Sequence, residues 1–150
     1  MSSHALLLVD DSPEDVQLIL HALQKVLPRD QVAVSDSGED ALDYLFARKA
    51  HAARDVTEQP RVVLLDLNLP RLPGLEVLRH MRANERTHML PVVVFSASVE
   101  QRDIRAAMST GANSYIRKSL DFAKLSESIE LLARYWLALN ISPPSAAHFE

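Results

Sequence analysis

Short, uninterrupted runs of apolar residues recur along the chain, separated by longer stretches with helical spacing. Three runs are continuous, namely Ala5–Val9, Val62–Leu65 and Val92–Phe95. Two weaker candidates are Gln31–Val34 and Ser114–Ile116. Continuous apolar runs of four or five residues are typical of strands buried on both faces of a parallel sheet. The pattern therefore predicts five strands.

Amphipathic stretches between these runs predict helices. The first, Pro13–Leu27, has Ser12 as a plausible N-cap and stops before Pro28. Four more are expected: a helix capped by Ser37 whose apolar stripe runs from Ala41 to Phe46, then Gly74–Ala83, Glu100–Thr110 closed by Gly111, and Asp121–Leu139. Strands that alternate with helices predict right-handed crossovers and a flavodoxin-like α/β fold, a doubly wound parallel sheet of order 2-1-3-4-5 with five helices.

Length and composition agree with one globular domain. The chain has 150 residues, of which 47% are hydrophobic and 24% charged, so we expect a single domain over residues 1–140 and a C-terminal tail over 141–150. Arg48–Pro60 reads as a polar extension before the third strand. No cysteine is present, which excludes disulfides, thiolate catalysis and cysteine-ligated zinc.

Charge and hydropathy exclude further classes of protein. The net charge is −4 and the 16 basic residues are spread along the chain, so we expect no nucleic-acid partner. No apolar run approaches the ~20 residues of a membrane span, and the N-terminal run is too short for a signal peptide. We therefore expect a cytoplasmic protein with no membrane partner.

Chemically reactive side chains follow four of the predicted strands. Asp10 and Asp11 follow the first, Asp66 the third, Ser96 the fourth and Lys118 the fifth. In an open α/β sheet the carboxyl ends of the strands meet at one edge, where ligands bind at the switch point between strands 1 and 3. Helix capping explains each residue in isolation, but it does not explain acids after both central strands with a cation facing them.

Three carboxylates in one pocket repel one another, and a divalent cation relieves that repulsion. An all-oxygen site without His or Cys selects a hard cation such as Mg²⁺. Three carboxylates (−3), Lys118 (+1) and Mg²⁺ (+2) sum to zero, so the site can accept a phosphoryl group. Asp66 lies centrally and can act as a carboxylate nucleophile that forms an acyl phosphate.

The combined motifs resemble the receiver domain of two-component response regulators over about Leu6 to Leu139. They are the pair Asp10-Asp11, the run DLNLP from Asp66 to Pro70, Ser96-Ala97 and Lys118. The resemblance implies a phosphoprotein that accepts its phosphoryl group from a sensor histidine kinase. It implies a protein that assists its own phosphotransfer and dephosphorylation and is otherwise not an enzyme.

The same resemblance assigns roles to individual residues. It implies that Asp66 is the phosphoacceptor and that Mg²⁺ is bound by Asp11 directly, by Asp10 through water and by the backbone carbonyl of Asn68. Lys118 would pair with the phosphate and Ser96 would hydrogen-bond it. The list is completed by Tyr115, which matches the aromatic residue that turns inward when the hydroxyl residue moves.

One position departs from the family, which usually has a proline after the lysine, across a cis peptide bond. Here Ser119 follows Lys118. A cis bond before serine costs ~3–4 kcal/mol, against less than ~1 kcal/mol before proline. We therefore expect a trans Lys118–Ser119 bond.

A narrower resemblance concerns the stand-alone response regulators of phytochrome kinases. It rests on DLNLP, on the long connection before the third strand and on Tyr135-Trp136. That subfamily dimerises through its final helix, and a predicted helix of ~28 Å should overhang strands of ~17 Å. We therefore expect a homodimer through Trp136 and Leu139, with Tyr135 and Leu137 widening the apolar face.

Two other classes use related chemistry. A Mg²⁺-dependent phosphatase of the haloacid-dehalogenase type also has an aspartyl nucleophile, but it needs a second acid at the place of Asn68, which cannot donate the required proton. A flavodoxin needs hydroxyls and amides after the first strand, where the acids from Asp10 to Asp15 would repel a phosphate.

Overall fold

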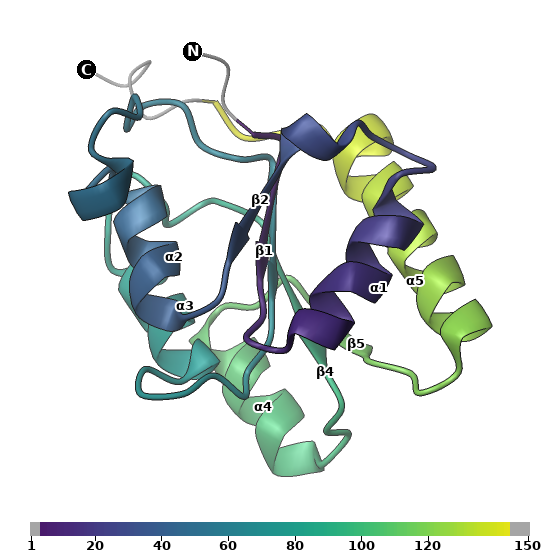
Figure 1. Ribbon diagram of the computed structural model, residues 1–150. Coiled ribbons are helices and arrows are strands. Elements are labelled where there is room, and N and C mark those ends of the chain that lie inside the picture. The colour runs from purple at the N-terminus through teal and green to yellow at the C-terminus, as the bar shows by residue number, and fades with distance from the viewer. Residues whose placement is uncertain (1–3, 145–150) are drawn as a thin grey trace.

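A five-stranded parallel sheet forms the centre of the computed structural model, which describes residues 4–144 (Figure 1). Its strands run in the order β2-β1-β3-β4-β5, and every pairing is parallel. The strands are β1 (Leu6–Val9), β2 (Val32–Ser35), β3 (Val62–Leu65), β4 (Val92–Ser96) and β5 (Ser114–Arg117). The predicted fold class and strand order are confirmed.

Helices cover both faces of this sheet. They are α1 (Pro13–Leu23), α2 (Gly38–Leu45), α3 (Gly74–Arg82), α4 (Gln101–Thr110) and α5 (Phe122–Arg134). In Figure 1, α1 and α5 lie together on one face, whereas α2, α3 and α4 cover the other. Short 3₁₀ turns, Arg29–Gln31 and Lys49–His51, lie in the connections.

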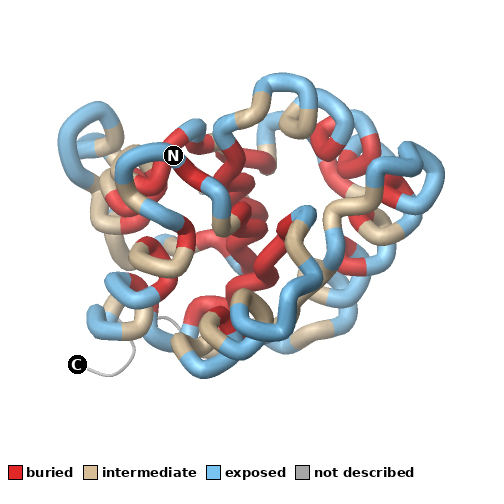
Figure 2. The backbone as a smooth tube through the Cα atoms, turned by 90° about the horizontal axis from the view of Figure 1, so that it is seen from below, coloured by how far each residue is buried: buried red, intermediate tan, exposed pale blue. Residues whose placement is uncertain are grey.

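Alternate residues of each central strand feed two separate cores. In β1, Leu6 and Leu8 pack with α1 and α5, whereas Leu7 and Val9 pack with α2, α3 and α4. All residues of β1, β3 and β4 are buried, and Figure 2 shows buried backbone running through the centre of the molecule. Burial on both faces explains the continuous apolar runs, and the half-buried edge strand β5 explains its weaker pattern.

Two helices end earlier than their periodicity predicts. The α1 helix ends at Leu23 rather than Leu27, because Lys25 and Val26 bond to carbonyls three residues back and tighten the chain into turns. The predicted helix to Leu139 is regular only to Arg134, and Tyr135–Leu139 forms a π-helical turn.

The π-helical turn corrects the predicted apolar overhang. A wide turn shifts the residues after it relative to the face of the preceding α-helix. Trp136, which was predicted to overhang the sheet, is instead partly buried against the core, and so is Leu137, which was predicted to widen the apolar face. Tyr135 and Leu139 are exposed, at 46% and 72%, as predicted.

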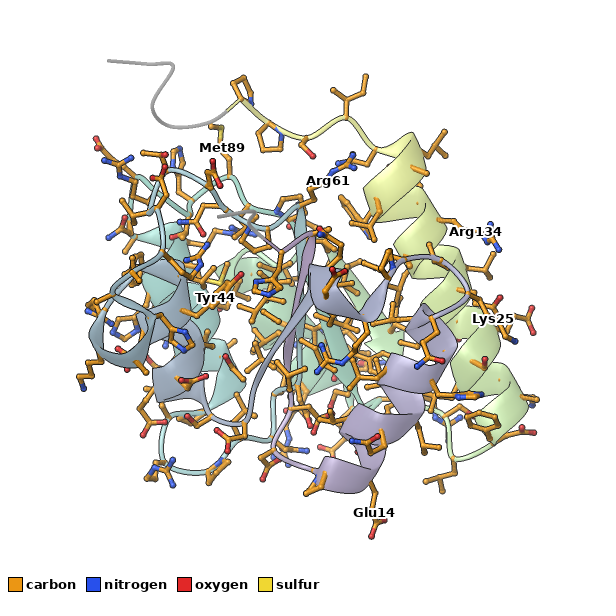
Figure 3. The ribbon with its side chains drawn as sticks, turned by 45° about the horizontal axis from the view of Figure 1, so that its top comes forward. Glu14, Lys25, Tyr44, Arg61, Met89 and Arg134 are labelled. Atoms are coloured by element: carbon orange, nitrogen blue, oxygen red, sulfur yellow. The ribbon has the colours of Figure 1, made fainter. Side chains whose placement is uncertain are left out.

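The predicted polar extension packs against α2. Arg54 stacks on the ring of Tyr44 at 3.8 Å from its centroid and donates to the Tyr44 backbone carbonyl, and Tyr44 lies on the α2 side of the molecule in Figure 3. Of the predicted tail, residues 141–144 form no helix or strand, Arg61 donates to Ser142 Oγ at 3.3 Å, and residues 145–150 lie outside the described part. The domain boundary at residue 140 stays a prediction.

Within residues 4–144, every helix is too short or too polar to cross a membrane.

Candidate phosphoacceptor site

The carboxyl edge of the sheet brings the predicted acids together. Asp10 follows β1 and Asp66 follows β3, and they are only 2% and 8% exposed. The parallel hydrogen-bond ladder continues one residue past each strand, because Asp10 N–H donates to Ser35 and Asp66 N–H donates to Val9, both at 3.0 Å. This backbone pairing sets the two carboxylates side by side at the switch point.

Lys118, directly after β5, reaches across the edge to these acids. Its Nζ lies 2.8 Å from Asp10 Oδ2, 3.0 Å from Asp66 Oδ2 and 3.0 Å from Asp15 Oδ2. Asp15 was not predicted as a partner of Lys118; the sequence marked it only as one of the acids after the first strand that would repel a phosphate. No local sequence signal marks this contact, because it joins the first turn of α1 to the end of β5 across 103 positions of sequence.

Three carboxylates form a cluster suited to a divalent cation. Asp10, Asp11 and Asp66 each offer an oxygen, and these oxygens all lie within 4.8 Å of one another. Asp11 is exposed while its two neighbours are buried, so an ion at this cluster could keep water ligands on the solvent side. Oxygen ligands alone fit a hard cation, and no other such group of acids and histidines occurs within residues 4–144.

Asp66 is held at both of its carboxylate oxygens. Its Oδ1 accepts a hydrogen bond from the Asn68 N–H at 3.0 Å, and its Oδ2 accepts from Lys118. Burial raises the pKa of Asp66, and the Lys118 charge with the Asn68 hydrogen bond offsets only part of that rise. The contribution of the Asn68 carbonyl to a cation stays a prediction.

For the ammonium of Lys118, the neighbouring carboxylates together affect the pKa more than burial does. Burial alone would lower the pKa of Lys118, but the hydrogen bond to Asp10 and the charges of Asp66 and Asp10 outweigh it and raise that pKa. Lys118 is therefore a permanent cation at neutral pH. Its peptide bond to Ser119 is trans, as predicted, since residues 4–144 contain no cis bond.

Ser96 and Tyr115 lie on either side of the loop between β4 and α4. Ser96 is fully buried, and its Oγ accepts from the Ser98 N–H at 3.2 Å. The Tyr115 hydroxyl donates to the Ser98 carbonyl at 2.9 Å. A cavity of about 170 Å³ lies beside Ser96, lined by Leu67, Asn68, Leu75, Ser96, Ser98, Asp103 and Ala106.

Glycine is required where α3 begins. A Cβ at Gly74 would lie 2.3 Å from the Asp66 carbonyl oxygen and 2.7 Å from the Leu67 Cα. Only glycine lets α3 approach this closely, and the Gly74 N–H donates to Leu67 at 3.0 Å. This approach shapes the loop that carries Asn68.

The arrangement can accept a phosphoryl group. Catalysis of phosphoryl transfer consists mainly of positioning and charge stabilisation. The site offers a buried carboxylate that can act as a nucleophile, an ammonium 3.0 Å from it, and a group of acids able to bind a cation. A hydroxyl at Ser96 lies at the same edge.

Comparisons with known proteins agree with this geometry. The family described as "Response regulator receiver domain" matches residues 6–130. The probable methanogenesis regulatory protein FilR2 of Methanothrix harundinacea is 38% identical, covering 94% of this chain and 88% of its own.

Two solved structures are also similar. The phosphorylated cyanobacterial phytochrome response regulator RcpA has a TM-score of 0.87 and 30% identity, covering 95% of this chain and 100% of its own. The Mn²⁺-bound form of the response regulator Rcp1, a protein of Synechocystis, has a TM-score of 0.84 and 28% identity, covering 93% of this chain and 98% of its own. The chain belongs to the response regulator receiver domain family.

Proposed function

We propose that this protein accepts a phosphoryl group from a sensor histidine kinase onto Asp66, with Mg²⁺ as cofactor. The observation that carries the proposal is the buried Asp66 carboxylate, which shares the cation cluster and lies 3.0 Å from Lys118. A phytochrome is the proposed kinase, because RcpA is a phytochrome response regulator. A cytoplasmic location and the absence of a nucleic-acid partner stay predictions.

In the proposed reaction, one Asp66 carboxylate oxygen attacks the phosphorus of a phosphohistidine. The phosphorus–nitrogen bond breaks, its electron pair returns to the imidazole, and an aspartyl phosphate forms. Lys118 donates to the phosphoryl oxygens, and Ser96 hydrogen-bonds one of them. Mg²⁺, bound through Asp10, Asp11, Asp66 and the Asn68 carbonyl, would supply neutralising charge for the phosphoryl oxygens.

The phosphatase alternative is not supported. Asn68 occupies the place where a haloacid-dehalogenase needs its acid, and its N–H is bonded to Asp66. We infer that the protein turns over no external substrate and acts only on its own aspartyl phosphate. The product of phosphorylation is then a changed surface.

Replacement of the acceptor, Asp66→Asn, should abolish Mg²⁺-dependent labelling by acetyl phosphate or by a kinase. The variant should also melt a few degrees higher at neutral pH without Mg²⁺. Burial raises the pKa of Asp66, so the ionised form disfavours folding, and the gain should shrink as the pH falls and wild-type Asp66 becomes protonated. Two measurements test these expectations. Release of the label by hydroxylamine, which cleaves acyl phosphates, reports the acceptor, and thermal melts between pH 4 and pH 7 report the stability. Undiminished acyl phosphate in the variant would refute the assignment.

Removal of the exposed cation ligand, Asp11→Ala, should weaken Mg²⁺ binding at least about tenfold. It should also raise the melting temperature of the metal-free protein, because fewer like charges then crowd the pocket. The matched control is Asp36→Ala, which removes an exposed acid from outside the cluster. Calorimetric titration with Mg²⁺ decides the point, and equal affinities for the Asp11 and Asp36 variants would exclude Asp11 as a ligand.

We also propose that phosphorylation is transmitted through Ser96 and Tyr115. The phosphate draws the Ser96 hydroxyl inward, and the β4–α4 loop, to which Tyr115 is bonded through Ser98, moves with it. The α4 helix can follow, since Ala107 is its one fully buried residue. The surface of α4, β5 and α5 is therefore the two-state element.

The Ser96→Ala variant should still become phosphorylated but should lose the coupled change at Tyr115. Tyr115 ring signals in NMR spectra, with and without beryllofluoride as phosphate mimic, report that change. Wild type should show two ring environments and the variant one. A single environment in wild type under both conditions would exclude this route.

The final helix is the proposed dimer surface. Leu131, Tyr135 and Leu139 recur every four residues and are 62%, 46% and 72% exposed, so they form one apolar stripe. Trp136 packs edge-on against Tyr135, with ring centroids 4.9 Å apart, and supports the stripe from the core side. Such a stripe on the surface favours a partner.

We expect the protein to sediment as a homodimer at micromolar concentration and Leu139→Ser to shift it towards monomer. Leu120→Ser is the matched control, because Leu120 is 99% exposed but lies outside the final helix. Trp136→Ala should also weaken the dimer, although it removes core packing as well. A monomeric wild type, with and without acetyl phosphate, would exclude the dimer.

A further inference from the structure

The ammonium of Lys118 has all three of its donors directed at carboxylates. A lysine ammonium carries three N–H donors, and its contacts here are Asp10 at 2.8 Å with Asp15 and Asp66 at 3.0 Å each. The Lys118 side chain is only 10% exposed. Lys118 can therefore turn towards a phosphoryl group only by exchanging one of these contacts.

Asp15 differs from the other two partners of Lys118. Asp10 and Asp66 belong to the cation cluster, whereas Asp15 does not. An ion held at that cluster would draw on the lone pairs of Asp10 and Asp66 and repel the ammonium, so both of these contacts to Lys118 would weaken. The contact to Asp15 would be the one not drawn upon by the ion.

The backbone fixes Asp15 in the place where it can serve Lys118. Ser12 Oγ accepts from the Asp15 N–H at 3.3 Å, and the Ser12 N–H donates to Asp10 Oδ1 at 3.0 Å. The start of α1 is thus tied to the buried Asp10, and from this turn the Asp15 carboxylate meets Lys118 across 103 positions of sequence.

A simpler role for Asp15 is to complement the dipole at the start of α1. Glu14 already supplies an acid in the same turn, is exposed, and points away from the molecule in Figure 3. The Asp15 side chain is only 36% exposed and faces Lys118. The helix dipole alone therefore does not explain why Asp15 turns inward.

We propose that Asp15 is a positioning residue, which keeps Lys118 at the carboxyl edge when a cation binds and so presents its ammonium to the incoming phosphoryl group. The inference rests on the proposed function, since it concerns the rate of phosphotransfer to Asp66. It adds a fourth carboxylate to the site, one that acts through Lys118 rather than on the cation or the phosphorus.

The first test needs no phosphodonor. Protein labelled with ¹⁵N-lysine should show a protected Lys118 ammonium signal, identified by its loss in Lys118→Arg. In wild type and in the matched control Glu14→Gln this signal should persist at saturating Mg²⁺. In Asp15→Asn, which keeps the shape and removes the charge, and in Asp15→Ala it should broaden or vanish when Mg²⁺ is added. A signal in the Asp15 variants that stays like wild type would overturn the proposal.

The second test measures labelling by acetyl phosphate. At saturating Mg²⁺ the Asp15→Ala variant should be labelled about fivefold more slowly than Glu14→Ala, the loss expected from one partly exposed charge-assisted hydrogen bond. The apparent Mg²⁺ affinity should stay within about twofold. A rate that recovers fully at high Mg²⁺ would show that Asp15 acts only through the charge of the cation site, contrary to the proposal. If wild type itself takes no label at Asp66, the proposed function fails, and the ammonium signal still decides the placement of Lys118.

Discussion

Negative charge concentrated at the carboxyl edge of the sheet is the constraint on which the rest of the site depends. Asp10 and Asp66 are buried there within reach of one ammonium. Buried carboxylates are costly unless they are paired, and Lys118 supplies the pairing in the absence of a cation. Because Lys118 holds several acids at once, a cation or phosphoryl group that enters must redistribute its contacts. The contacts within the site therefore change when a cation or phosphoryl group enters, because the charges of Lys118 and the carboxylates balance only in part.

The sheet makes this crowding possible at acceptable cost. Backbone bonds carry the parallel ladder one residue beyond β1 and β3, so the carboxylates are placed by main chain rather than by flexible loops. Gly74 lets α3 approach the end of β3 closely. Two hydrophobic cores, one on each face, stabilise the strands that end in these acids. The two cores thus supply the stability of the sheet, and they offset the repulsion between the carboxylates crowded at its edge.

The connection from the edge to the outer surface is short. Ser96 accepts a bond from the Ser98 N–H, and the Ser98 carbonyl accepts one from Tyr115. Three residues therefore span the distance from the buried hydroxyl to the rim of β5. The α4 helix beside them buries little of its own surface, so a small shift at the edge meets little resistance there.

The sequence by itself determined the architecture and most of the site, because both follow from local patterns. Continuous apolar runs marked the strands buried on both faces, and parallel order then carried Asp10, Asp66 and Lys118 to one edge. The trans bond before Ser119 followed from the energy of a single peptide bond. The tertiary structure alone decided what depends on distant packing. The contact of Asp15 with Lys118 requires α1 and β5 to be docked on the same sheet, and the inward turn of Trp136 requires a π-helical turn that periodicity does not reveal. Side-chain contacts of this kind depend on helix placement and rotamer, which neighbouring residues in sequence do not encode.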